Sequence, residues 1–112
     1  MTKPEDLPYR IEGRQLIAED TSMRVQILTL EEGDQVPWHR HTFVTDTFIC
    51  LDGPMVVNTR NPSATHILSH GETIAVGPST AHQVIGQGGA YCRFVIVQSG
   101  GAHDYIPADD QG

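Results

Sequence analysis

Two histidines and an acid occur close together in the segment GDQVPWHRHTFVTDTFICLDG, residues 33–53. His39 and His41 are separated by one residue, and Asp46 follows five residues after His41. Side chains alternate between the two faces of a β-strand, so both imidazoles would project from one face, about 6 to 7 Å apart. Imidazole nitrogens bind divalent transition metals at about 2 Å, and both could reach one ion from these positions. The spacing therefore predicts part of a metal site that takes further ligands from elsewhere.

Two residues are candidates for those further ligands. Asp46 could supply a carboxylate oxygen, and His82 lies in a later β-like segment, PSTAHQV. The remaining histidines are His66, His70 and His103, which flank turns or lie in the polar tail. We expect these three to be solvated rather than to bind metal.

The segments that must position these residues are short and β-like. Eleven glycines and seven prolines fall mainly in clusters between apolar or alternating segments, a spacing typical of strands and turns. Residues 23–30 alternate, which predicts a strand with one apolar face and one face that is polar at its start. About eight such strands in residues 22–98 predict an all-β barrel or two-sheet jelly roll. Residues 1–21 are interpreted as an N-terminal arm with one short strand around 14–18, and residues 99–112 as a polar tail.

Composition limits the class of partner. A chain of 112 residues is long enough for one domain. Seven basic and fourteen acidic residues give a net charge of −7, which disfavours nucleic acid and anionic membrane surfaces and favours a small molecule. No apolar run resembles a signal or a membrane span, so we expect a cytoplasmic location. Cys50 and Cys92 lie in apolar runs, as reduced, buried thiols do.

These residues resemble the two motifs of the cupin superfamily. The first motif runs Gly, five residues, His, one residue, His, three or four residues, Glu, six residues, Gly. The second places a Gly eleven residues before a third metal-binding His. The matching positions here are Gly33, His39, His41, Asp46 and Gly53 for the first motif, and Gly71 and His82 for the second.

The sequence departs from the family pattern at two places. Asp46 is one methylene shorter than the usual Glu, so it could bind a metal directly or orient a water or a histidine from outside the ligand set. The glycine usual in the turn of the second motif is absent, with Ser79 and Thr80 in its neighbourhood, and Pro78 comes one place later than usual. These changes leave the geometry of that turn open.

The resemblance implies a cupin-type double-stranded β-helix, or jelly-roll barrel, with one divalent transition metal per chain. Iron, manganese, nickel, zinc and copper all suit such a site. The implied ligands are His39, His41, His82 and Asp46. A centre of this kind can polarise a carbonyl or an enediol, or bring dioxygen to a bound substrate.

Three functions follow from this chemistry. The first is a metal-dependent enzyme acting on a small, mostly neutral organic metabolite, with dioxygenase-type oxygen insertion as the leading reaction. The second is a redox-neutral isomerase, lyase or decarboxylase in which Asp46 or a nearby group moves a proton. The third is a non-catalytic binding or sensor module, because the fold alone does not choose between chemistries.

The expected neutral substrate rests on the predicted lining of the site. That lining is mainly apolar and hydroxyl-bearing, with Thr42, Thr45, Thr47 and Val84, and lacks a basic cluster for a phosphate or polycarboxylate. The polar residues whose orientation stays open are Arg24, Gln26, Asn58, Arg60 and Arg93.

The sequence also predicts a homodimer. A jelly roll of this length leaves sheet edges uncovered, and uncovered edges invite association. Trp38, on the face opposite His39, is expected at the interface. The arm supplies apolar residues that could lie along a partner's sheet, namely Leu7, Tyr9, Ile11, Leu16 and Ile17.

Overall fold

The computed structural model describes residues 11 and 13–108, which form ten β-strands and one short 3-10 helix. The strands are β1 (Gly13–Glu19), β2 (Met23–Leu30), β3 (Gln35–Arg40), β4 (Thr45–Asp52), β5 (Met55–Thr59), β6 (Ala64–Leu68), β7 (Thr73–Val76), β8 (His82–Gly86), β9 (Cys92–Ser99) and β10 (Ile106–Pro107). The helix is η2 (Gln87–Gly89). No helix among the described residues is long and apolar enough to cross a membrane.

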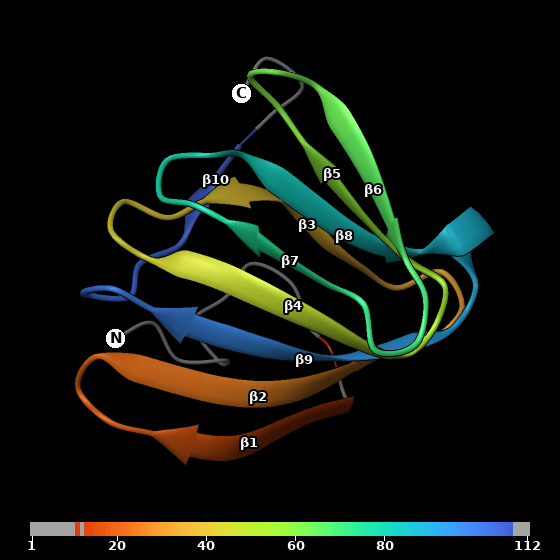
Figure 1. The fold of residues 1–112 in the computed structure, drawn as a ribbon, viewed down its shortest axis with the longest axis horizontal. Coiled ribbons are helices and arrows are strands. Elements are labelled where there is room, and N and C mark those ends of the chain that lie inside the picture. The colour runs from red at the N-terminus through yellow and green to blue at the C-terminus, as the bar shows by residue number, and fades with distance from the viewer. Residues whose placement is uncertain (1–10, 12, 109–112) are drawn as a thin grey trace.

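The strands form two five-stranded antiparallel sheets. One sheet has the order β1-β2-β9-β4-β7 and the other β10-β3-β8-β5-β6. Figure 1 shows the strands running alongside one another in the two sheets, with β1 at one margin and the β5–β6 hairpin at the other. Neighbours distant in sequence, such as β2 with β9 and β3 with β8, give the jelly-roll connectivity. The all-β jelly-roll prediction is confirmed.

Every second residue along the strands of both sheets points into the interior. In β4 the side chains of Asp46, Phe48 and Cys50 are buried while their neighbours are half-buried. The ring of Phe48 packs edge-on against that of Phe94 in β9, with centroids 5.7 Å apart, a favourable aromatic geometry. Cys50 and Cys92 are both free and fully buried, as predicted from their apolar surroundings.

The polar start of β2 faces the interior. Arg24 and Gln26 are buried, whereas Val25 between them is half-buried on the outer surface. Leu28 and Leu30, in the same strand, are 2% and 0% exposed, so the face of β2 that carries them is the inner one. Every second residue before them must then point the same way. The interior of this barrel is therefore polar at one end.

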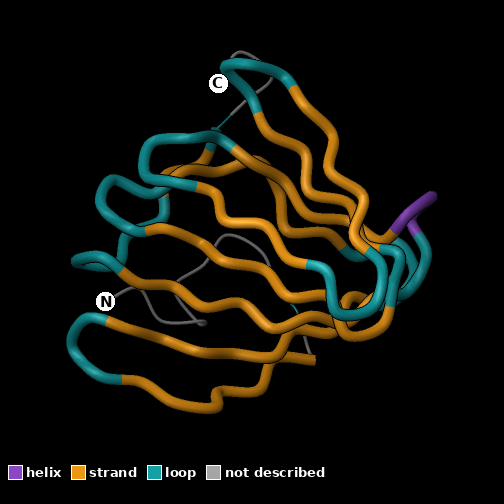
Figure 2. Tube along the Cα trace, viewed as in Figure 1, coloured by secondary structure: helices purple, strands orange, loops and turns teal. Residues whose placement is uncertain are grey.

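Both ends of the described chain join the sheets. The short strand expected around residues 14–18 is confirmed, because β1 pairs with β2 along its length. The tail returns as β10, where Ile106 pairs with Arg40 and the Ala108 N–H donates to the Trp38 carbonyl at 2.9 Å. Figure 2 shows this strand separated from β9 by a loop. Pattern reasoning missed β10 because two residues, one of them Pro107, carry no alternation. The predicted roles of Leu7 and Tyr9 lie outside the described residues.

Candidate metal centre

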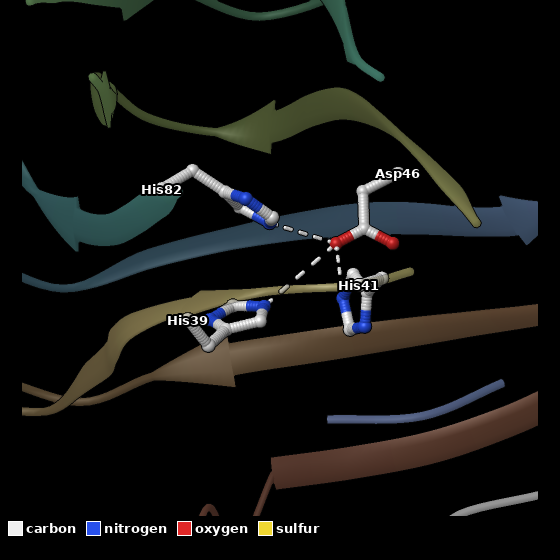
Figure 3. A group of neighbouring side chains, drawn as sticks. All are labelled: His39, His41, Asp46 and His82. Atoms are coloured by element: carbon white, nitrogen blue, oxygen red, sulfur yellow. Dashed lines mark hydrogen bonds and ion pairs between the residues drawn. The ribbon is translucent and has the colours of Figure 1, made fainter. Parts of the chain in front are cut away.

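Four side chains from both sheets converge inside the barrel. His39 is the last residue but one of β3, and His41 directly follows that strand. His82 is the first residue of β8. Asp46 faces them from β4 in the other sheet. One ligand-type atom from each of the four lies within 4.8 Å of all the others, and all four side chains are buried. Figure 3 shows the three imidazoles pointing at one carboxylate oxygen. The structure thus brings together all four residues singled out from the sequence.

The far side of each imidazole ring faces a backbone carbonyl. The Nδ1 atom of His39 lies 2.8 Å from the Pro37 oxygen, and that of His82 lies 2.9 Å from the Thr80 oxygen. In His41 the Nδ1 atom faces the Asp104 carbonyl. A carbonyl only accepts, so each Nδ1 carries a hydrogen, and a ring that holds only this hydrogen presents the lone pair of Nε2 to the centre. This is the arrangement that metal-binding histidines show in proteins.

The donor set fits a divalent cation. The Asp46 Oδ2 atom lies 3.0 Å from His41 Nε2, 2.8 Å from His82 Nε2 and 3.9 Å from His39 Nε2. Lone pairs and a carboxylate oxygen this close repel one another unless a proton or a metal ion lies between them. Bonds of about 2.0 to 2.2 Å at right angles separate two ligand atoms by about 3 Å, which matches the two shorter separations. His39, His41, His82 and Asp46 would hold such an ion.

Asp46 is ionised in this environment. Burial by itself would raise the pKa of Asp46, but the neighbouring imidazoles of His39, His41 and His82 outweigh it and hold the pKa well below its usual value. Burial also opposes the charged form of His41, yet the bond to Asp46 and its negative charge raise the pKa of that imidazole. Burial lowers the pKa of His39. Metal binding requires a carboxylate and neutral imidazoles, so Asp46 and His39 suit an ion as they are, whereas His41 would release any proton on Nε2 when the ion binds.

The shorter acidic side chain still reaches the centre. Asp46 is 0% exposed, and its second oxygen, Oδ1, accepts a hydrogen bond from the Gln98 amide at 3.1 Å. Sequence reasoning missed Gln98, which lies opposite Asp46 in the β4–β9 register. The glutamine fixes the orientation of the carboxylate that the histidines share.

The glycine positions of the two motifs have physical causes. Gly33 and Gly71 adopt φ values of +86° and +82°, which glycine adopts without the steric cost of a Cβ atom. Ser79 also takes positive φ, at 65°, and its N–H donates to the His41 carbonyl at 2.7 Å. The turn before His82 therefore keeps a left-handed residue although its usual glycine is absent.

A cavity of about 40 Å³ opens beside the histidines. Its walls include Arg14, Arg24, Gln26, Gln98, His103 and Tyr105, together with apolar residues of β2, β4 and β9. The prediction that threonine hydroxyls line the site was wrong. Thr45 and Thr47 have the parity opposite to Asp46, and Thr42 is exposed and bonds Asp104.

The expectation for the other histidines holds for two of the three. His66 is half-buried on β6, and His70 is exposed, with its Nδ1 atom 2.6 Å from the Leu51 carbonyl. His103 is 8% exposed and lines the cavity, so its predicted solvation was wrong. The return of the chain as β10 carries His103 inward and stacks the ring of Tyr105 on His39, with centroids 4.7 Å apart.

A model of the cupin domain family matches residues 26–106. The chain belongs to the cupin family. Among curated proteins, none matches the sequence significantly. The solved structures of cupins that are similar to it share the fold at low sequence identity.

One of these is a conserved protein with a double-stranded β-helix domain from Klebsiella pneumoniae. It is 18% identical, with a TM-score of 0.74 over 98% of this chain and 97% of that chain. A cupin-2 domain protein from Shewanella frigidimarina is 20% identical, with a TM-score of 0.64 over 81% and 83%. An oxalate oxidase is 15% identical, with a TM-score of 0.68 over 78% of this chain and 46% of that chain. These likenesses support the fold and not a shared reaction.

Proposed function

We propose that this cupin is a metal-dependent enzyme acting on a small organic metabolite, with dioxygenase-type oxygen insertion as its leading reaction. The observation that carries the proposal is the buried group of three Nε2 atoms and one carboxylate oxygen beside a cavity. Three histidines and one acid leave positions open on a six-coordinate ion such as iron, manganese or nickel. A metal bound there would supply Lewis acidity or a site for dioxygen.

The side chains around the group have separate roles in this proposal. His39, His41 and His82 hold the ion, and the carbonyls of Pro37, Asp104 and Thr80 orient their rings. Gln98 orients Asp46. Tyr105 covers His39 and lines the cavity, where it limits access of water to the centre.

A redox-neutral isomerase, lyase or decarboxylase is the second proposal. It requires a group that moves a proton while the metal stabilises an enediolate, and Asp46 is the candidate for that group. Both oxygens of Asp46 have partners, the histidine nitrogens at Oδ2 and Gln98 at Oδ1. That engagement favours an orienting or metal-binding role for Asp46 and so supports the oxygenase as the leading reaction.

The test begins with protein purified without a His-tag and without added metal. We expect one divalent transition metal per chain by elemental analysis. A screen of small metabolites under air and under nitrogen, with iron(II) present, should then give oxygen uptake coupled to substrate loss. Turnover that is equal under nitrogen would favour the redox-neutral reaction. Binding of a metabolite without metal and without turnover would favour a sensor module.

We also propose that the protein is a homodimer associating through the β1 side. Among the strands of the described residues, β1 is an edge of its sheet, and its side chains Leu16 and Ile17 are 56% and 50% exposed. Trp38 lies on the outer face of β3, half-buried beneath the Arg60 guanidinium at 3.6 Å. Light scattering at micromolar concentration should give twice the chain mass of 12.3 kDa.

A substitution on β1 tests the surface used. Leu16→Glu should shift the mass toward one chain, because it places a charge on the apolar edge. Ile67→Glu is the matched control, since Ile67 is 52% exposed on β6 in the other sheet. A full-length protein of single-chain mass would contradict the dimer.

A further inference from the structure

The three imidazoles of the metal group (His39, His41, Asp46 and His82) differ in where their carbonyl partners come from. The Nδ1 atoms of His39 and His82 each face the carbonyl of the residue two positions earlier in the chain. Chain connectivity keeps such partners close together. The Nδ1 atom of His41 instead faces the carbonyl of Asp104, 63 positions later. The orientation of the His41 ring therefore depends on how a distant segment of the chain is held.

The side chain of Asp104 fixes the position of that carbonyl. Its Oδ1 atom accepts a hydrogen bond from the Thr42 N–H at 2.9 Å, and its Oδ2 atom accepts one from the Thr42 hydroxyl. Thr42 directly follows His41 in the chain. Asp104 thus bonds the His41 ring through its carbonyl and the adjacent residue through its carboxylate. Bonds to a carboxylate are stronger than bonds between neutral groups, so the carbonyl has little freedom to leave the ring.

The backbone of the C-terminal segment, residues 100–108, is held by a short strand. Strand β10 is two residues long and pairs with β3 at Ile106 and Pro107. The Ala108 N–H also donates to the Trp38 carbonyl. A strand pairing of this length is marginal by itself. The bonds from the Asp104 carboxylate therefore add substantially to the docking of the segment.

The charge of Asp104 contributes less than its geometry. Its Oδ1 atom lies 4.0 Å from the Nδ1 atom of His41, on the side of the ring that faces away from the centre. A carboxylate there strengthens an imidazole as a metal ligand. The Asp104 side chain is 38% exposed, however, so water screens its charge. The main effect expected of Asp104 is the placement of the His41 ring.

We propose that Asp104 is a positioning residue of the metal centre, which holds His41 in its metal-binding orientation by bonding Thr42. The inference rests on the proposed function in that the four side chains of the metal group are taken to bind the ion. The C-terminal segment is then part of the metal site, although none of its described residues belongs to the group. Docking of the segment and binding of the ion stabilise each other by the same free energy.

The zinc affinity of the full chain, measured by competition with a chromogenic chelator at one pH, tests the assignment. Asp104→Ala should lower the affinity about tenfold or more, within the range for loss of an outer hydrogen-bond partner. Asp104→Asn should lose less, because an amide oxygen still accepts from the Thr42 N–H. Thr42→Val should lower the affinity about fivefold, the size of one hydrogen bond. Thr42→Ser keeps the hydroxyl and should restore the affinity.

Asp20→Ala is the matched control. The Asp20 carboxylate likewise accepts from two backbone N–H groups and a hydroxyl, those of Ser22 and Met23, in an exposed turn. Asp20 lies outside the metal group and its cavity, so the variant should bind zinc as the unaltered protein does. The double variant Asp104→Ala/Thr42→Val should lose no more affinity than Asp104→Ala alone, because both changes remove the same contact.

Hydrogen exchange at the imidazole rings separates positioning from a general loss of stability. In nitrogen-15-labelled metal-free protein, a ring N–H that is bonded to a buried carbonyl exchanges slowly with water. Asp104→Ala should speed exchange at Nδ1 of His41 about tenfold or more and leave His39 and His82 within about twofold. Circular dichroism checks folding. If Asp104→Ala does not fold, Thr42→Val and Thr42→Ser carry the same comparison.

Equal zinc affinities of Asp104→Ala and the unaltered protein would overturn the proposal, and so would equal acceleration of exchange at all three rings. A Thr42→Ser variant that binds zinc as weakly as Thr42→Val would do the same. Unaltered protein that binds no zinc would instead contradict the metal centre itself. Protein that binds zinc equally well with and without the Asp104 carboxylate retains the proposed centre and loses only the positioning role.

Discussion

His82→Ala should lower the affinity of the protein for divalent metal by more than about 100-fold. The Nε2 atom of His82 lies 2.8 Å from Asp46 Oδ2. Its ring is oriented by the Thr80 carbonyl, so Nε2 is directed at the place where the ion would lie. Losing a direct ligand should exceed the 10- to 100-fold loss that follows removal of an outer hydrogen-bond partner. His39→Ala and His41→Ala should act alike, because each removes one Nε2 atom from the same group.

Metal content after dialysis and competition with a chromogenic chelator measure the effect. His66→Ala is the matched control, since His66 is a half-buried histidine of β6 outside the group, and it should bind metal as the unaltered protein does. Melting curves of the metal-free variants show whether they remain folded. Full metal occupancy in all three site variants would refute the assignment of the centre.

Asp46→Asn should lower metal affinity about 10- to 100-fold, less than any of the histidine substitutions. Asparagine keeps the shape of the side chain and removes the charge, so the variant isolates the contribution of the carboxylate. The site loses its one anionic donor, and a neutral amide oxygen binds a divalent ion more weakly. The three imidazoles remain to hold the ion.

The size of this loss distinguishes the two roles open to Asp46. A loss as large as that of His82→Ala would show that the carboxylate is a direct ligand of equal weight. Unchanged metal affinity would show that Asp46 takes no part in the centre. Asp52→Asn is the control, because Asp52 is exposed at the end of the same strand, β4, and should leave metal affinity unchanged. The measurement is the same chelator competition, made at one pH for all variants.

The local pattern of the sequence determined the pair of histidines in the candidate metal centre and the turns beside them. His39 and His41 are alternate residues, and alternation along an extended chain is a property of the backbone itself. Gly33 and Gly71 mark turns with positive φ, a conformation that few other residues adopt cheaply. Features of this kind depend on neighbours a few positions away, so motif spacing could predict the fold and three histidines of one site.

Only the tertiary structure decided what surrounds that site. The alternation in β2 predicted two faces but did not say which was inside; Leu28 and Leu30 placed Arg24 and Gln26 in the interior. Asp46 meets His82 and Gln98 from 36 and 52 positions away in the sequence. Which side chains face the interior depends on cross-strand register, because a shift of one residue exchanges the two faces of a strand.

The C-terminal segment shows most plainly that contacts between residues distant in sequence were not predicted. Its composition predicted a polar tail with a solvated His103, yet His103 is buried, Asp104 offers its carbonyl to His41, and Tyr105 stacks on His39. These contacts span more than sixty positions. They are made by a segment in which the one strand of the described residues, β10, is two residues long. The sequence by itself determined a cupin barrel and the four residues of its candidate metal centre. The polarity of the cavity beside them came from long-range pairing, because burial of a side chain depends on what packs over it.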